Sequence, residues 1–412
     1  PVMAKKVLAI LAALCLLATV LTVGASATGD TITAEDQKYR ILTLADVQHG
    51  AEEDINLVGF IESALKYLDE NDVDSADLVV LLGDVVTGSG AESRDTIETA
   101  VKEVLAPIVT AGVPFAVVFG DSDQGDSGLT HEELQQIYIN SGDGLCINEV
   151  AKADENYLLD GNGGINFFYT VSTEKKGDDG AVVRTPYANL FFFDVGAVDE
   201  GEDGPAYVRQ DQIDWFNTNN DVEIPAYVFQ HIGVPQAFSQ MLKSPFNLEL
   251  PGTKKVLGQN YFSGIPNNVE MVGSVLEHVS AAQNEDGDGE FAALKDAGNV
   301  RALFFGNDPR NQFILQYNNF QLVQISGAAW FGTPGSFLVR GGTFITLHTS
   351  QLNGQQLFTS DFFTYRQAAR TYPSEVNTAI NDFGDFLSII TFAWQNLWID
   401  LLAPIRWTQG GF

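Results

Sequence analysis

The first third of the chain alternates short apolar runs with stretches of helical periodicity, and this pattern restricts the fold more than any other feature. The apolar runs occupy residues 41–45, 77–82 and 114–119. Between them, residues 55–68 and 96–110 carry apolar side chains at the spacing of one helical face. Strands that show no polar alternation are buried on both faces. The pattern therefore predicts an α/β fold in which a parallel sheet is covered by helices.

Each of these three predicted strands ends in an aspartate, namely Asp46, Asp84 and Asp121. The carboxyl ends of parallel strands meet at one edge of a sheet, where α/β proteins place their functional sites. A single Gly-Asp pair after a strand is ordinary turn chemistry. Three converging carboxylates repel one another, so a proton or a cation must neutralise them. We therefore expect a polar site at this edge.

The remainder of the chain predicts further strands and helices. We expect strands of a mixed or antiparallel sheet at residues 157–159, 165–171 and 189–194. A helix at 208–217 precedes a strand at 226–229, and a long irregular insert follows at 235–273. The last predicted elements are a helix at 291–297 and strands at 300–305, 313–317, 320–325 and 343–347.

Five short polar motifs follow predicted strands in a fixed order. They read LADVQHG at 44–50, LGDVVTG at 82–88, FGDSD at 119–123, FQHIGVP at 229–235 and FGNDPRN at 305–311. Their order resembles that of the calcineurin-like metallophosphoesterases, in the branch related to purple acid phosphatases. That family carries Asp-x-His, Gly-Asp, Gly-Asn-His, a lone His and Gly-His-x-His. The segments QIDWF at 212–216 and GGT at 341–343 support the resemblance.

The resemblance implies a four-layer α-β-β-α sandwich of two mixed sheets, with a phosphoesterase domain at residues 36–350. It also implies a site for two cations about 3.5–4 Å apart, which polarise a phosphoryl group and activate a water molecule. Matched position by position, the metal ligands are Asp46, Asp84, Asp121 and His231. Asp84 takes the place of the carboxylate that bridges the ions, and Asp84 and His231 are the catalytic residues if the chain is active.

Four positions depart from the family pattern. Gln48, Ser122, Asn307 and Pro309 stand where the family has histidines. His49 is adjacent to the first of these positions, but a neighbouring residue leaving a strand points elsewhere. Fewer imidazoles disfavour Zn, Fe and Mn, whereas carboxylate oxygens suit Ca or Mg. The expected cofactor is one hard divalent cation or none.

These substitutions leave three functional hypotheses. The favoured one is a pseudoenzyme of the phosphoesterase family, non-catalytic or repurposed to bind a phosphorylated or glycan ligand. The second is an active extracellular metal-dependent phosphatase or phosphodiesterase that uses Mg or Ca at a reduced site. The third is a structural surface protein that assembles through its carboxyl-terminal helix.

The amino-terminal segment has the layout of a secretory signal peptide. A basic start at Lys5 and Lys6 precedes an uncharged run at 7–23 and the small-residue exit ASA at 25–27. We therefore expect residues 1–27 to be removed after Ala27 and the protein to be secreted or displayed at the cell surface. Cys146 is then the last cysteine, and we expect it to be a buried apolar residue.

The net charge of the chain and its carboxyl-terminal segment indicate which partners to expect. The chain has 54 acidic against 22 basic residues, so nucleic acid is not an expected partner. Residues 375–412 form a predicted hydrophobic helical tail. Within it, residues 383–407 are long enough to dock on the protein, to self-associate or to contact a membrane interface.

Overall fold

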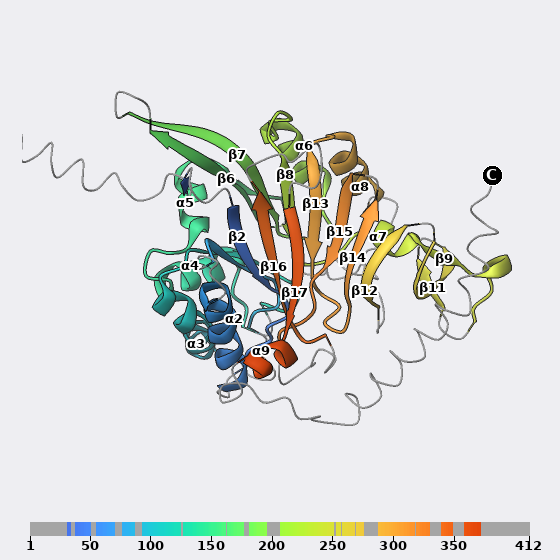
Figure 1. Cartoon of the computed structure of the whole chain (residues 1–412), viewed down its shortest axis with the longest axis horizontal. Coiled ribbons are helices and arrows are strands. Elements are labelled where there is room, and N and C mark those ends of the chain that lie inside the picture. Colours follow the sequence, from blue (N-terminus) through green and yellow to red (C-terminus); the bar gives the residue numbers. More distant parts are fainter. Residues whose placement is uncertain are drawn as a thin grey trace, which may run out of the picture.

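The computed structural model shows two large sheets packed face to face with helices on both outer sides (Figure 1). The parts of the chain that it describes comprise sixteen segments, which are residues 31–33, 38–50, 55–70, 76–86, 93–124, 127–161, 163–176, 181–195, 207–250, 253–256, 258–267, 269–275, 287–317, 319–329, 339–348 and 358–371. The predicted signal peptide and the predicted tail at 375–412 lie outside these residues. No helix in the described part is long and apolar enough to span a membrane.

The first sheet has five strands in the order β17-β16-β2-β3-β4. Its strands are β2 (Lys38–Leu44), β3 (Leu78–Leu82), β4 (Phe115–Val118), β16 (Gly341–His348) and β17 (Phe358–Thr364). The three strands nearest the amino terminus run parallel, as the sequence predicts, and β16 and β17 add antiparallel edges. All residues of β3 and β4 are buried, which agrees with their continuous apolar character.

The second sheet has nine strands, and its centre is parallel. Its path runs β1-β6-β7-β8-β13-β15-β14-β12, and β5 pairs with β6 beside it. Strands β7, β8, β13 and β15 are mutually parallel, whereas β6, β14 and β12 pair antiparallel. The bounds are β1 (Thr31–Thr33), β5 (Tyr157–Leu159), β6 (Ile165–Lys176), β7 (Val182–Phe193), β8 (Ala226–Gln230), β12 (Glu270–Ser274), β13 (Val300–Phe305), β14 (Gln312–Tyr317) and β15 (Phe320–Gln324).

Alternate residues of the nine-stranded sheet enter two different cores. Tyr227 and Phe229 of β8 join the core shared with the five-stranded sheet, and Val228 joins the core on the other face. Across the two sheets, the ring centroids of Tyr227 and Phe358 lie 5.3 Å apart. The helical layer outside the five-stranded sheet comprises α2 (Ile55–Glu70), α3 (Arg94–Ala111), α4 (His131–Ser141), α5 (Ile147–Ala153) and α9 (Tyr365–Thr371). The layer outside the nine-stranded sheet comprises α6 (Gln210–Asn219), α7 (Pro235–Ser239) and α8 (Gly287–Asp296). The predicted four-layer α-β-β-α sandwich is confirmed.

The segment at 235–273 corrects one prediction, because it is not an irregular insert. It contains α7, β9 (Met241–Lys243), the short 3-10 helix η1 (Pro245–Asn247), β10 (Thr253–Val256) and β11 (Gln259–Pro266) before β12. Strands β10, β11 and β9 form a separate antiparallel sheet. Their buried positions include the polar Thr253 and Asn260 beside the apolar Met241, Val256 and Tyr261, so they lack the apolar pattern that marks a strand in sequence.

Strand β17 and helix α9 lie beyond the predicted domain boundary at residue 350. β17 pairs with β16 along its whole length. In α9, the ring of Tyr365 stacks on Phe60 of α2 at a centroid distance of 4.2 Å. The folded unit therefore continues to Thr371, because these aromatic side chains complete the core between the five-stranded sheet and its helices.

Candidate metal centre

The turns that follow the strands of both sheets adopt an unusual backbone conformation. Asp46, Gln48, Asp84 and Asn307 have φ angles of 47°, 48°, 50° and 69°. Asp and Asn tolerate this left-handed region because their short side chains can bond to the backbone nearby, whereas Gln48 has no such advantage. Backbone strain of this kind clusters at functional sites and persists only when the surroundings enforce it.

Backbone hydrogen bonds between distant loops enforce these turns. The amide of Asp46 donates to the carbonyl of Gly83 at 3.1 Å, and that of Gln48 donates to the carbonyl of Asp84 at 2.8 Å. Beyond the neighbouring strands β8 and β13 of the nine-stranded sheet, the amide of Gly306 donates to the carbonyl of His231 at 2.8 Å. Main-chain hydrogen bonds between these segments therefore help to position the loops.

His231 lies at the centre of the predicted carboxylates. Its Nε2 is 3.5 Å from Oδ1 of Asp84, 3.6 Å from Oδ1 of Asp121 and 4.0 Å from Oδ1 of Asp46. Its Nδ1 donates to the carbonyl of Leu82 at 2.9 Å. A backbone partner at Nδ1 fixes the ring so that Nε2 is the atom offered to the carboxylates, which is the usual arrangement of a metal-binding histidine.

Two glycines allow this close packing. A Cβ at Gly83, whose φ is +78°, would collide with the His231 imidazole. A Cβ at Gly120 would collide with Oδ1 of Asp84 and with the same ring. Glycine is required at both positions because the side chains of His231 and Asp84 lie directly against the backbone.

The donor set fits one cation. Ligand atoms of Asp46, Asp84 and His231 all lie within 4.8 Å of one another, and no other group of three such residues is found in the described segments. The buried Nε2 of His231 and Oδ1 of Asp121 have no hydrogen-bond partner, as expected of atoms arranged to coordinate an ion. Burial lowers the pKa of His231, but the negative charge of Asp84 and the adjacent carboxylates of Asp121 and Asp46 outweigh it and raise that pKa well above its usual value.

The four substituted positions lie around the same centre but provide no imidazole. The amide of Asn307 donates to Oδ2 of Asp46 at 3.0 Å, and the amide of Ser122 donates to Oδ1 of Asp84 at 2.9 Å. The carbonyl of Pro309 accepts from the amide of Gly327 at 3.0 Å. We call Asp84, Asp121 and His231 the retained side of the centre. Gln48, Asn307 and Pro309 form the substituted side, and Asp46 lies between the two.

His49 does not replace the missing ligand. Its Nε2 contacts Oε2 of Glu103, on α3, at 2.6 Å, and its side chain is buried. The ring is therefore directed toward the helical layer, in agreement with the alternation of side chains along an extended chain.

The sequence model of the calcineurin-like phosphoesterase family matches residues 39–311 of the chain. The chain belongs to that family. This phosphoesterase-family chain is 22% identical over 333 residues to a protein of Arabidopsis thaliana named "Probable inactive purple acid phosphatase 14", a match that covers 72% of each chain. It is also 22% identical over 258 residues to "Phosphatase DCR2" of Saccharomyces cerevisiae, covering 56% of this chain and 40% of that protein. The crystal structure of a dimetal phosphatase from Danio rerio aligns over 76% of this chain and 93% of its own, at 13% identity and a TM-score of 0.45.

One functional residue of this phosphoesterase-family chain was not predicted. The carboxylate of Asp123 accepts four backbone hydrogen bonds, from the amides of Asp84, Val85, Val86 and Gly120 at 2.8, 2.8, 3.2 and 2.7 Å. Burial and the nearby charge of Asp84 raise its pKa to about 6, although the backbone donors oppose the shift. Asp123 thus ties the Asp84 loop to the Asp121 loop. The only signal in the sequence is its place at the end of the FGDSD motif.

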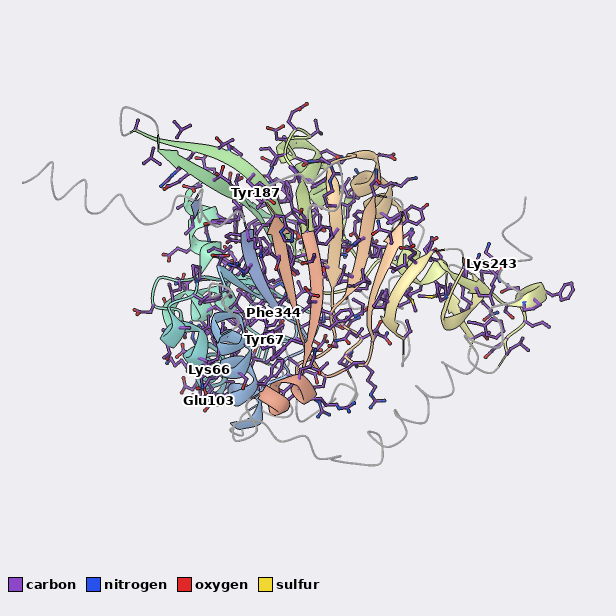
Figure 2. The ribbon with its side chains drawn as sticks, viewed as in Figure 1. Lys66, Tyr67, Glu103, Tyr187, Lys243 and Phe344 are labelled. Atoms are coloured by element: carbon purple, nitrogen blue, oxygen red, sulfur yellow. The ribbon has the colours of Figure 1, made fainter. Side chains whose placement is uncertain are left out.

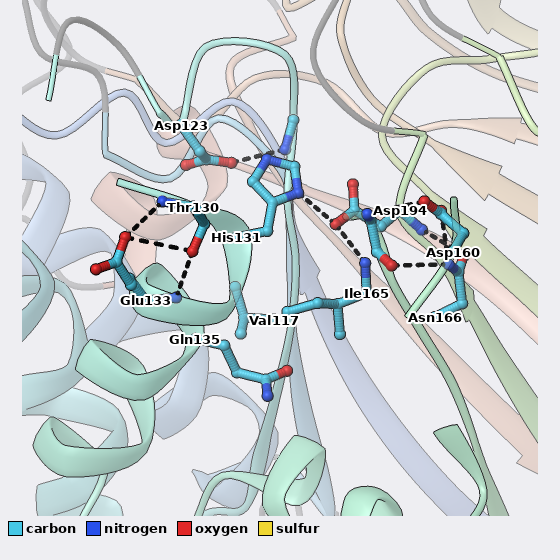
Figure 3. A network of polar contacts seen from close by, with 12 residues as sticks. Val117, Asp123, Thr130, His131, Glu133, Gln135, Asp160, Ile165, Asn166 and Asp194 are labelled. Atoms are coloured by element: carbon cyan, nitrogen blue, oxygen red, sulfur yellow. Dashed lines mark hydrogen bonds and ion pairs between the residues drawn. The ribbon is translucent and has the colours of Figure 1, made fainter. Parts of the chain in front are cut away.

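His131, the first residue of α4, connects that helix to the second sheet. Its ring contacts the carboxylate of Asp194, which follows β7, as Figure 3 shows. Nδ1 of His131 is 2.6 Å from Oδ2 of Asp194, and the same oxygen accepts from the amide of Ile165 at 2.8 Å. Burial lowers the pKa of His131, but the charge and hydrogen bond of Asp194 outweigh it and raise that pKa above its usual value. A histidine at the start of a helix gives no sequence signal for this role.

Proposed function

We propose that this phosphoesterase-family chain holds a single divalent cation and binds a phosphate-bearing ligand with little or no hydrolysis. The observation that carries the proposal is the asymmetry of the centre. Asp46, Asp84 and His231 offer ligand atoms within 4.8 Å of one another, and Asp121 lies 3.6 Å from the same imidazole, whereas the substituted side offers no imidazole for a second ion. Phosphoester hydrolysis in this family relies on two cations that stabilise both the attacking and the leaving oxygen.

The chemistry of one cation still suits ligand binding. With 54 acidic and 22 basic residues, the protein repels a phosphate ester at long range, so a local positive centre is needed. A bound cation supplies that centre. Three carboxylates and one imidazole form a mainly oxygen donor set, which favours Mg or Ca over Zn, Fe or Mn.

The loss of the histidine at Ser122 supports weak or absent turnover. A histidine at that position would protonate the leaving group, and general acid catalysis of this kind contributes on the order of 10²–10⁴ in rate. A serine hydroxyl is too weak an acid for this role. One relative bears a name that calls it inactive and another is named a phosphatase, so the proposal rests on the substitutions in this chain itself.

Metal analysis, calorimetric titration and turnover assays test the proposal together. The purified full chain is titrated with Mg, Ca, Mn and Zn and assayed with an aryl phosphate and an aryl phosphodiester. We expect one cation per chain, no turnover above background, and loss of cation binding in Asp84→Asn. The matched control is Asp154→Asn, because Asp154 is exposed at the end of α5 and outside the centre.

Two results would contradict the proposal. Two tightly bound transition-metal ions per chain would show that the substituted side finds other ligands. Turnover that disappears in Asp84→Asn and persists in Asp154→Asn would establish an active phosphatase or phosphodiesterase.

We also propose export, on the strength of the signal-peptide pattern at residues 1–27. Sequencing the amino terminus of the protein recovered outside its producing cells tests this. We expect the mature chain to begin at Thr28, and a mature chain that retains Lys5 and Lys6 would contradict the proposal.

A further inference from the structure

The small three-stranded sheet carries an exposed apolar loop at residues 244–250. Phe246 is 95% exposed, and Leu248 and Leu250 are 52% and 36% exposed. The loop joins β9 to β10 at the edge of the molecule, on the same projecting sheet as Lys243 in Figure 2. An aromatic side chain this exposed packs against little of the part of the chain that the structure describes.

Polar contacts hold the loop rigidly. Oδ1 of Asn247 accepts from the amide of Asn260 at 2.6 Å, and its Nδ2 donates to the carbonyl of Gly258 at 3.1 Å. The hydroxyl of Ser244 donates to the carbonyl of Leu248 at 2.6 Å. These contacts keep Phe246 at a φ of 53°, a strained conformation for a bulky residue. A rigid loop that displays an apolar residue loses little conformational freedom when that residue binds.

The charge around the loop differs from that of the whole chain. Residues 224–269 contain one acidic residue, Glu249, against the lysines at 243, 254 and 255. Lys243 and Lys255 are exposed beside the loop. This segment is therefore basic and apolar on a protein that is otherwise strongly acidic, so its charge is complementary to an anionic surface.

We propose that the loop at 244–250 inserts Phe246, Leu248 and Leu250 into the interface of an anionic lipid bilayer. Apolar side chains flanked by lysines are typical of segments that lie in the lipid headgroup region. Protein interfaces also favour Phe, together with Tyr, Trp, Met and Arg, but they are depleted in the Lys that flanks this loop. This inference is independent of the metal centre.

The acidic remainder of the chain is compatible with this contact. At physiological salt, charges more than about 8 Å from an anionic surface are largely screened. Because the three-stranded sheet projects from the edge of the molecule (Figure 1), its lysines reach the bilayer before the acidic body does.

Vesicle flotation of the full chain tests the proposal. The vesicles are phosphatidylcholine alone, or roughly 70:30 phosphatidylcholine and phosphatidylserine, at physiological salt. We expect preferential binding to the anionic vesicles and a loss of about tenfold in affinity for Phe246→Asn, because one large apolar side chain leaves the bilayer. Asn tolerates the left-handed backbone, so the loop keeps its shape. Val222→Asn, at another exposed apolar residue that is 59% exposed, is the matched control and should bind as the parent does.

A second experiment locates the loop directly. In Phe246→Trp, we expect the tryptophan emission to shift to shorter wavelength on adding anionic vesicles and to be quenched by brominated lipid, with no such change in Val222→Trp. Lys243→Glu combined with Lys255→Glu should remove the preference for anionic vesicles. Equal vesicle binding by the parent and Phe246→Asn would overturn the proposal. So would the absence of vesicle binding together with a dimer that Phe246→Asn dissociates, because the loop would then bind a second copy of the chain.

Discussion

The retained and substituted sides of the metal centre share a backbone design and differ in side-chain chemistry. Asp84 on one side and Gln48 and Asn307 on the other all occupy left-handed turns at strand ends. On the substituted side, the amide of Asn307 still donates to Asp46, while the imidazoles of the family are missing. Backbone amides are thus hydrogen-bonded on both sides of the centre, whether or not the imidazole of the family is present.

The largest loss of stability is expected at Asp123, whose carboxylate binds the backbone amides of the retained side. Asp123→Ala removes the acceptor of four buried amides, and each unsatisfied buried donor costs about 1–3 kcal/mol. We expect the free energy of unfolding to fall by about 4 kcal/mol or more, with loss of cation binding. Denaturant unfolding and calorimetric titration measure the two effects. Asp121→Ala should lose the cation at little cost in stability, because this side chain is 29% exposed.

A slightly smaller loss of stability is expected when a methyl group is placed against His231. Gly83→Ala combines the cost of a left-handed backbone with a collision against His231, together about 3 kcal/mol. Gly112→Ala is the matched control, because Gly112 has a φ of +69° and open space around its Cα. We expect that control to lose only about 1 kcal/mol in denaturant unfolding. Equal losses in the two variants would mean that the centre is not tightly packed.

Restoring the substituted side should convert it into a second metal site. Gln48, Asn307 and Pro309 are replaced together by histidine, since His is among the residues that tolerate left-handed turns. Because the loops are already held by their main chains, we expect a second Zn or Mn ion per chain, bound about 100-fold more tightly than by the parent. Metal analysis after dialysis measures this. A variant that folds and still holds one ion would show that the backbone of this side has drifted from the geometry of a metal site.

The ion pair between His131 of α4 and Asp194, which follows β7 of the second sheet, should depend on pH. The pKa of His131 is raised, so the stability contributed by its pair with Asp194 is fully present below the unfolded value of about 6.5. It is lost as pH rises through the higher pKa of the folded state. We expect the difference in unfolding free energy between the parent and His131→Gln to be on the order of 1–2 kcal/mol near pH 6 and to shrink at alkaline pH. A difference that grows with pH would contradict this assignment.

The smallest effect is expected at His49. His49→Ala removes the contact with Glu103, and we expect a loss of about 1 kcal/mol in unfolding free energy. Calorimetric titration should give unchanged cation affinity, because the ring is directed away from the centre. A tenfold weaker affinity would show that His49 serves the substituted side after all.

Much of the fold and the identity of the site residues could be predicted from sequence. Continuous apolar runs before Asp46, Asp84 and Asp121 predict buried parallel strands, because such runs are stable only when both faces are covered. The burial of Cys146 at 1% exposure, with a pKa raised to about 12, also confirms the expectation of an inert thiol. In contrast, the strands at 235–273 and the element β17 were missed, because weak apolar alternation does not distinguish a surface strand from a loop.

The side chains available at the candidate centre can be read from the sequence alone: aspartates at 46, 84 and 121, a histidine at 231, and no imidazole at 48, 122, 307 or 309. These identities belong to individual residues and do not depend on how the chain packs around them. Only the tertiary structure decided that Nε2 of His231 faces the carboxylates, that His49 turns to Glu103, and that Asp123 holds the loops. These outcomes depend on hydrogen bonds between segments far apart in the chain, and no local pattern of residues encodes such contacts.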